Sequence, residues 1–214
     1  MTYAQEVPPE IPVPGPEFPR RRPDAPAVAP PLPLISDDAA VDPRALLLRQ
    51  RRVMLTGAID DDVVTRAAAE LMMLDGESSR PVEVIVNSDG GPVHAALGLL
   101  DVLDLMRAPV ATRCIGRAIG TAAVVLASGT RGRSAASGAR IGLRLHDRYD
   151  VSGRAVDIER FAEQLDHARD QVAARLRRVT QLDDAQIAHE LESGEPMTAE
   201  AARRHGLVDE IIRR

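Results

Sequence analysis

The sequence predicts an α/β domain with a largely parallel sheet, preceded by a proline-rich arm. Three observations carry this prediction. Strand-like and helix-like patterns alternate from about residue 45 to the C-terminus, as they do in repeated strand–helix units with right-handed crossovers. Twelve of the sixteen prolines fall within residues 1–43, where no apolar periodicity survives. The apolar residues, 44% of the chain, are almost all aliphatic, because aromatic residues supply only 2%.

We therefore expect two parts: residues 1–43 as an extended, disordered arm and residues 44–214 as a single folded domain. A chain of 214 residues can bury one good-sized core. The first strand is expected within "ALLLRQRRVMLTG", which starts at Ala45 and is closed by Gly57.

The following elements are predicted from apolar spacing and turn residues. "DDDVVTRAAAELMMLDG" and "PVHAALGLLDVLDLM" have helical spacing, and between them "PVEVIVNS" is a β-branched run typical of a buried strand. "APVATRCIG" and "ARIGLRLHD" predict two further strands, separated by a short helix, "TAAVVLASG". "AVDIERFAEQLDHARDQVAARLRRV" predicts a long amphipathic helix of roughly seven turns. Two helices capped by Asp183 and Thr198 and a final "LVDEII" segment complete the domain.

Composition argues against several classes of partner. The net charge of −5 provides no electrostatic footprint for nucleic acid or for an anionic membrane, and the few aromatics leave no platform for stacking bases. No window of the sequence approaches the uninterrupted apolar length of a membrane span. The single cysteine, Cys114, cannot form an internal disulfide, so a reducing, cytoplasmic location is expected. We expect no nucleic-acid partner, no membrane partner and no cofactor.

Two glycine-marked turns are the candidate functional segments. "CIGRAIGTAAVVLASG" has the pattern of a strand, a turn and a small-residue helix, which is the usual mounting of a serine nucleophile, but no serine stands at the turn. "VNSDGGPV" places Gly90 and Gly91 between a strand and a helix, where backbone amides can bind an oxyanion. Glycines also occur at such turns for steric reasons alone.

Six blocks of the sequence can be read together: "RRVMLTGAIDD", "VIVNSDGG", "CIGRAIGTAA", "ARIGLRL", "AVDIERFAEQL" and "MTAEAARRHGLVDEII". Over residues 45–212 they resemble the ClpP family, the proteolytic subunit of the Clp protease. The family has "FLxGxIDD", "IxxYINSPGG", "TICxGxAASMGA", "SRxMIHQP", "ATDIExxAxEI" and "LSAxEAxxYGLVDxI" at the same successive places. The resemblance implies the ClpP/crotonase fold, in which stacked, largely parallel β layers are wrapped by helices and one helix protrudes as a handle.

The family is a serine peptidase, and the resemblance assigns its catalytic triad to three positions of this chain. The nucleophilic serine of "AASMG" corresponds to Gly120, the histidine of "SRxMIHQP" to Arg144, and the aspartate ahead of "LSAxEA" to Gly194. Glycine offers no nucleophile, and an arginine that stays protonated cannot accept the serine proton. The chain is therefore predicted to be catalytically inactive. Gly90 and the Thr121 backbone match the oxyanion-hole positions that remain.

Two substitute sites are weighed against this prediction. A relocated triad of Thr121, His146 and Glu192 would need three coordinated displacements, each of a size that typically abolishes catalysis. Ser88 with His94 is an alternative dyad, although Ser88 also suits a turn or cap and His94 an exposed helix position. The other histidines lie on separate helix faces, so no metal site is predicted. Acyl-CoA chemistry on the shared crotonase scaffold lacks a suitably placed carboxylate.

The resemblance also implies partners. Family members form stacked rings that receive an ATP-driven unfoldase, so we expect a homo-oligomer or a mixed ring with an active ClpP paralogue, and a Clp ATPase unfoldase as a further partner. The long helix resembles the handle between rings, and its stripe of Ile158, Phe161, Leu165 and Val172 suits oligomerisation; packing onto the chain's own core is the competing explanation.

The family's paired tyrosines, in the apolar cleft where the unfoldase docks, correspond to Glu83 and Ile85. A glutamate there should weaken docking through its desolvation cost. The sequence thus predicts a non-catalytic, ClpR-type subunit with a structural or regulatory role. The alternative is an active ATP-dependent serine-type endopeptidase subunit with a relocated site.

Overall fold

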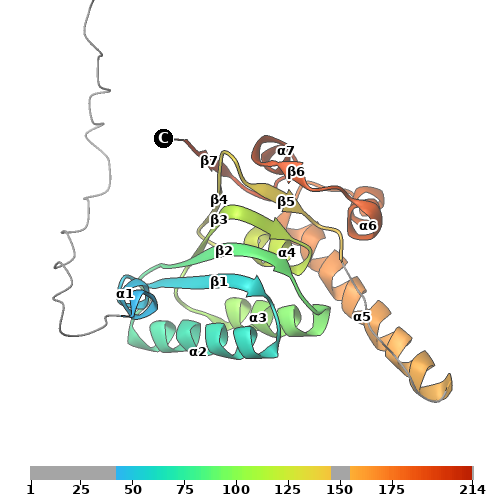
Figure 1. Cartoon of the computed structure of the whole chain (residues 1–214), viewed down its shortest axis with the longest axis horizontal. Helices are drawn as coiled ribbons and strands as arrows, with labels where there is room; N and C mark the ends of the chain where they lie inside the picture. The colour runs from blue at the N-terminus through green and yellow to red at the C-terminus, as the bar shows by residue number, and fades with distance from the viewer. Residues whose placement is uncertain (1–41, 146–154, 214) are drawn as a thin grey trace, which may run out of the picture. The chain divides into compact units, whose positions relative to one another are not determined.

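The computed structural model describes residues 42–145 and 155–213 (Figure 1). The arm expected at residues 1–43 thus falls almost wholly outside the described residues. The helices are α1 (Pro43–Arg49), α2 (Asp61–Glu77), α3 (Val93–Leu105), α4 (Thr121–Ala127), α5 (Ala155–Val179), α6 (Asp184–Ser193) and α7 (Ala199–Arg204). The strands are β1 (Arg52–Ala58), β2 (Val82–Gly90), β3 (Val110–Ile119), β4 (Gly132–Ala136), β5 (Arg140–Gly142), β6 (Met197–Thr198) and β7 (Glu210–Ile212).

The strands form one largely parallel sheet in the order β1-β2-β3-β4-β7. The sheet divides at β3, which pairs in parallel with β4 along its first half and with β5 along its second half. Only the pairing of β5 with β6 is antiparallel among the described strands. Helices α2 and α3 lie together along one side of the sheet (Figure 1). The predicted α/β fold with a largely parallel sheet is confirmed.

The core lies between the sheet and the helices. On β2, Val82, Val84 and Val86 are buried, and they alternate with Glu83 and Ile85, which are half-buried. This alternation follows from the period of two in a strand, which turns successive side chains to opposite faces. All seven residues of α4 are buried, so its small and branched apolar side chains are those a fully enclosed helix requires.

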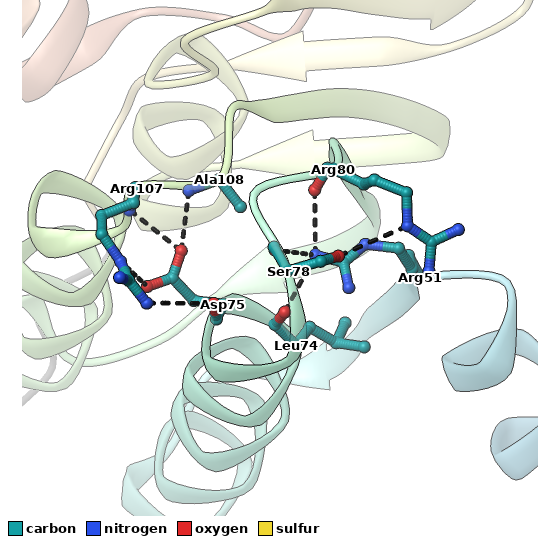
Figure 2. Close-up of polar contacts among 7 residues, drawn as sticks. All are labelled: Arg51, Leu74, Asp75, Ser78, Arg80, Arg107 and Ala108. Carbon is teal, nitrogen blue, oxygen red and sulfur yellow. Dashed lines mark hydrogen bonds and ion pairs between the residues drawn. The ribbon is translucent and has the colours of Figure 1, made fainter.

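Arg51 closes the C-terminal end of α2. It is buried, and it has a left-handed backbone with φ +59°. Its guanidinium donates hydrogen bonds to the carbonyls of Leu74, Ser78 and Arg80 at 2.9, 3.0 and 2.9 Å (Figure 2). These carbonyls belong to the last turn of α2 and to the loop after it, where a helix leaves acceptors without intrahelical partners. A single cation thus satisfies this helix end and fixes the loop that leads to β2.

Asp75 ties the same end of α2 to the loop before β3. Its carboxylate accepts hydrogen bonds from the backbone amides of Arg107 and Ala108 at 2.9 and 2.7 Å (Figure 2). The bond from the Ala108 amide is the main cause of a lowered pKa of Asp75, since a donor that faces the charged form stabilises it. Together, Arg51 and Asp75 set the spacing between α2 and the entries of β2 and β3.

The structure differs from the sequence-based expectations mainly at the strands. The segment that begins at Ala45 starts with helix α1, and β1 begins only at Arg52. Strand β4 was not predicted, and the strand predicted from "ARIGLRLHD" ends at Gly142. The caps at Asp183 and Thr198 are confirmed, because both side chains accept a hydrogen bond from a backbone amide in the first turn of the helix that follows.

Candidate functional site

The turn between β3 and α4 has the backbone of a nucleophile mounting. Gly120 has φ +56° and ψ −125°, a left-handed conformation that favours glycine. Its amide donates to the carbonyl of Gly142 on β5 at 2.7 Å. A Cβ built on Gly120 would lie 3.1 Å from the backbone oxygen of Arg144. The structure therefore brings the first two predicted triad positions side by side.

The third position, Gly194, follows the last turn of α6, and its amide donates to the carbonyl of Glu190 at 3.2 Å. The end of α6 runs beside the chain that carries Arg144, because the Leu145 amide donates to the Leu191 carbonyl at 3.0 Å. The segments that hold all three predicted triad positions therefore meet in one region of the fold.

The residues at these three positions do not carry the side chains of a serine-protease triad. Gly120 and Gly194 have no side chains. Arg144 is exposed, and a guanidinium offers hydrogen-bond donors but no acceptor, so it cannot serve as a general base. Of the three roles in a serine-protease triad, which are nucleophile, base and orienting carboxylate, none is filled by the residue at its own position.

The amides of the two-glycine turn are already hydrogen-bonded. The Gly90 amide donates to Ser88 Oγ at 2.9 Å, and that hydroxyl donates in turn to the Gly57 carbonyl at 2.5 Å. The Gly91 amide donates to Thr121 Oγ1 at 2.9 Å. In this conformation neither glycine amide is free to receive an oxyanion. The Thr121 amide stands at the first position of α4, where a helix leaves its amides without intrahelical acceptors.

Two of the three substitute residues considered from the sequence, Thr121 and Glu192, lie in the described part of the chain, each in surroundings of its own. Thr121 is 1% exposed, and its hydroxyl both accepts from and donates to the backbone of Gly91. His146 lies outside the described residues. Glu192 is exposed on α6, where it lines a separate cavity of about 260 Å³ with Leu145 and Arg169.

The alternative dyad of Ser88 and His94 is likewise separated by its contacts. The Ser88 hydroxyl is buried and engaged with Gly57 and Gly90. The His94 side chain is 64% exposed, and its Nε2 lies 3.7 Å from Asp61 Oδ1 at the start of α2. Each residue thus has a structural partner of its own, which matches the competing explanation given to it from the sequence.

An open groove of about 530 Å³ lies next to the degenerate centre. It is lined by Asp89, Gly116, Arg117, Ile119, Arg140 and Pro196. Arg117 NH1 lies 3.0 Å from Asp89 Oδ1. Sequence reasoning missed Arg117 and Arg140 as site residues. The signal available was weak: Arg117 stands three residues before Gly120 and Arg140 four residues before Arg144, in the blocks "CIGRAIGTAA" and "ARIGLRL", but the resemblance assigned no role to either arginine.

Residues 36–214 match the family model for Clp protease. The chain belongs to the Clp protease family. It is 36% identical over 174 residues to a Clp protease proteolytic subunit-like protein of Streptomyces coelicolor, covering 80% of this chain and 82% of that protein. It is 32% identical over 177 residues to the chloroplastic Clp protease proteolytic subunit 4 of Arabidopsis thaliana, covering 81% of this chain and 60% of that protein.

At the positions compared with the Clp docking cleft, the structure holds an ion cluster on the open face of the sheet. Glu83 on β2 pairs with Arg52 on β1 at 2.9 Å and with Arg113 on β3 at 2.6 Å. Its side chain is 17% exposed. Ile85 is half-buried beside it on the same face. The two arginines thus neutralise the charge of Glu83, for which the sequence alone indicated no partner.

The two ends of the long helix α5 of this Clp-family chain lie in different surroundings. The end of α5 near Val179 packs on the body of the domain, and the other end projects away from it (Figure 1). Ile158 is 41% exposed, whereas Phe161 and Leu165 are half-buried and line a cavity of about 130 Å³ with His94. Val172 is fully buried in the chain's own core. This corrects the expectation that Val172 belongs to an oligomerisation stripe, because helix α5 turns that position toward the domain.

Two further searches of the described residues were negative. Residues 42–145 and 155–213 hold no group of three or more His, Cys, Asp or Glu side chains placed to bind a metal ion. None of the helices in these ranges has both the length and the apolar character needed to cross a membrane.

Proposed function

We propose that this chain is a non-catalytic, ClpR-type subunit of a Clp protease, with a structural or regulatory role in the assembly. The observation that carries the proposal is the set of residues at the three triad positions, Gly120, Arg144 and Gly194, within a fold that keeps the strand–turn–helix mounting. Family membership alone would suggest a peptidase. The chemistry of these positions argues for a subunit that shapes the chamber without cutting peptides.

The closed amides around Gly90 and Gly91 support the same proposal. An oxyanion hole stabilises a tetrahedral intermediate only when its donors are free and aimed at the oxyanion. Here the donors of the turn are held by Ser88 and Thr121. A relocated active site, the alternative, would have to free Thr121 from Gly91 and supply a base.

A labelling experiment distinguishes the non-catalytic role from the relocated active site. The purified full-length chain, alone and co-expressed with an active ClpP paralogue, is treated with a fluorophosphonate probe and assayed for peptide hydrolysis. The active paralogue in the same sample is the positive control. We expect the probe to label the paralogue and not this chain. Specific labelling of this chain, abolished by Thr121→Val, would support the relocated site instead.

We expect the partner to be an active ClpP paralogue in a mixed ring or a second copy of this chain, with an unfoldase of the Clp ATPase type as the further partner. The proposed location is the cytoplasm, for which the argument is a single, buried cysteine. Native mass spectrometry of the complex purified from its own cells measures the composition of the ring. Recovery of this chain free of any ClpP-type ring would contradict the assembly role.

A further inference from the structure

The groove beside Gly120 contains two arginines at directly paired positions. Arg117 on β3 and Arg140 on β5 are partners in the register of these parallel strands, and both line the groove. Like charges at neighbouring positions of a sheet destabilise it. One carboxylate of the groove, that of Asp89, pairs with Arg117. The groove therefore keeps an excess of positive charge that the pairing of strands does not require.

A third arginine lies just beyond the end of β5. Along residues 140–145 the positions Ile141, Leu143 and Leu145 are buried, while Arg140 and Arg144 are exposed. The backbone oxygen of Arg144 lies 3.1 Å from the Cβ position of Gly120, which directly follows Ile119 of the groove. Among the described residues that line the groove, two are arginines and one is a carboxylate.

The walls between these charges suit an extended peptide. Ile119 and Pro196 provide apolar surface. The volume of about 530 Å³ falls within the range of ligand sites. Guanidinium groups bind carboxylates with charge-assisted and often bidentate hydrogen bonds.

We infer that this groove binds peptides through a carboxylate, either the C-terminal carboxylate or that of an acidic side chain. The inference rests on the proposed function, because a bound peptide is retained only where Gly120 and Arg144 leave it uncut. The same site that hydrolyses peptides in an active subunit then holds peptide ends in this one.

The test uses fluorescence anisotropy with the full-length chain and three pentapeptides labelled at the N-terminus. One is polyalanine with a free C-terminal carboxylate, one is its C-terminal amide, and one is the amide with a central glutamate. We expect one or both carboxylate peptides to bind at least about tenfold more tightly than the neutral amide, and to weaken as salt rises. Equal binding of the neutral amide, or no saturable binding of either carboxylate peptide, would overturn the inference. The two carboxylate peptides distinguish the two sources of the charge.

Single substitutions test whether the peptides bind in this groove. Arg117→Gln and Arg140→Gln should each weaken the carboxylate peptides by about two- to fivefold, as expected for partly exposed ion pairs. Asp89→Asn should strengthen binding, because it removes the competing carboxylate. Arg66→Gln, an exposed arginine of α2 outside the groove, is the matched control and should change nothing. Equal loss in Arg66→Gln and Arg140→Gln would mean non-specific attraction and would refute the site.

The peptide-binding test and the test of the proposed function can fail independently of each other. Labelling by the fluorophosphonate probe would refute the non-catalytic role whatever the anisotropy shows. Absence of peptide binding in an unlabelled chain would refute only the carboxylate groove. Circular dichroism of each variant confirms that a lost signal does not come from a lost fold.

Discussion

The carboxylate of Glu190 occupies the space into which a side chain at Gly194 would extend. A Cβ built on Gly194 lies 2.7 Å from the backbone oxygen of Glu190 and 2.9 Å from its Cα, and Glu190 Oε2 is closer still. Two of these three atoms belong to the backbone, so a change of rotamer at Glu190 cannot remove the collision. The position that the resemblance assigns to the orienting aspartate is closed here by the main chain of α6.

Gly194→Ala tests this closure with the smallest possible side chain. We expect it to destabilise the fold by about 1–3 kcal/mol, the usual cost of overpacking. Gly98→Ala in α3 is the matched control, because a Cβ there meets nothing within 4 Å. It should stabilise by about 0.4–1 kcal/mol. Urea unfolding followed by circular dichroism measures both. Equal changes in the free energy of unfolding for the two variants would show that the end of α6 can move to make room for a side chain at position 194.

Substituting serine, histidine and aspartate at the three triad positions should not restore peptidase activity. In Gly120→Ser/Arg144→His/Gly194→Asp, the turn keeps the backbone of a nucleophile mounting, but the serine Cβ would lie 3.1 Å from the backbone oxygen of residue 144. The new aspartate would meet the Glu190 backbone. We expect no peptide hydrolysis above that of the parent chain and no fluorophosphonate labelling. An active triple variant would mean that substitution of side chains alone had silenced the site.

The strand–turn–helix mounting of the site could be predicted from the sequence because the signals are local. Glycine at position 120 between a branched apolar run and a run of small residues predicts the turn between β3 and α4, and the structure has it there. The contacts that close the site are not local. Thr121 meets Gly91 across 30 positions of the chain, and no pattern of spacing within either segment indicates that pair.

The paired arginines escaped sequence reasoning for a related reason. Between Val86 and Ser88 on β2 the partner on β3 advances from Cys114 to Ala118, so β3 carries two extra residues at this point. A bulge of this kind changes which side chains oppose one another. The register that places Arg117 beside Arg140 begins within this irregular part of β3. Strand composition alone does not reveal the length of such an insertion.

Arg51 is expected to be the single most important cation for stability near α2. Arg51→Met keeps much of the apolar stem but leaves the carbonyls of Leu74, Ser78 and Arg80 without this donor (Figure 2). A buried acceptor that loses its donor costs about 1–3 kcal/mol. Because Ser78 is only half-buried, Arg80 is exposed and the Leu74 carbonyl still accepts from the Ser78 amide, a total loss of about 1–3 kcal/mol is expected from urea unfolding. Arg80→Met removes an exposed guanidinium from the same loop and should stay within about 0.5 kcal/mol. A loss for Arg51→Met no larger than that of Arg80→Met would contradict the capping role.

The ion pair between Arg133 and Asp209 should make part of the stability depend on pH. Arg133 donates from its backbone amide at 2.8 Å and from Nε at 3.0 Å to Asp209 Oδ2, and the side-chain hydrogen bond is the main cause of a lowered pKa of Asp209. A carboxylate whose pKa is lower in the folded state contributes stability above its ordinary pKa of 3.8, and this stability is lost as the pH falls further. Asp209→Asn should therefore lower the urea midpoint at pH 7, and the difference from the parent chain should shrink between pH 4 and lower values. Asp101→Asn, at an exposed position of α3, is the comparison. A difference for Asp209→Asn that is the same at pH 7 and at pH 3 would show that the charge of Asp209 does not stabilise the fold.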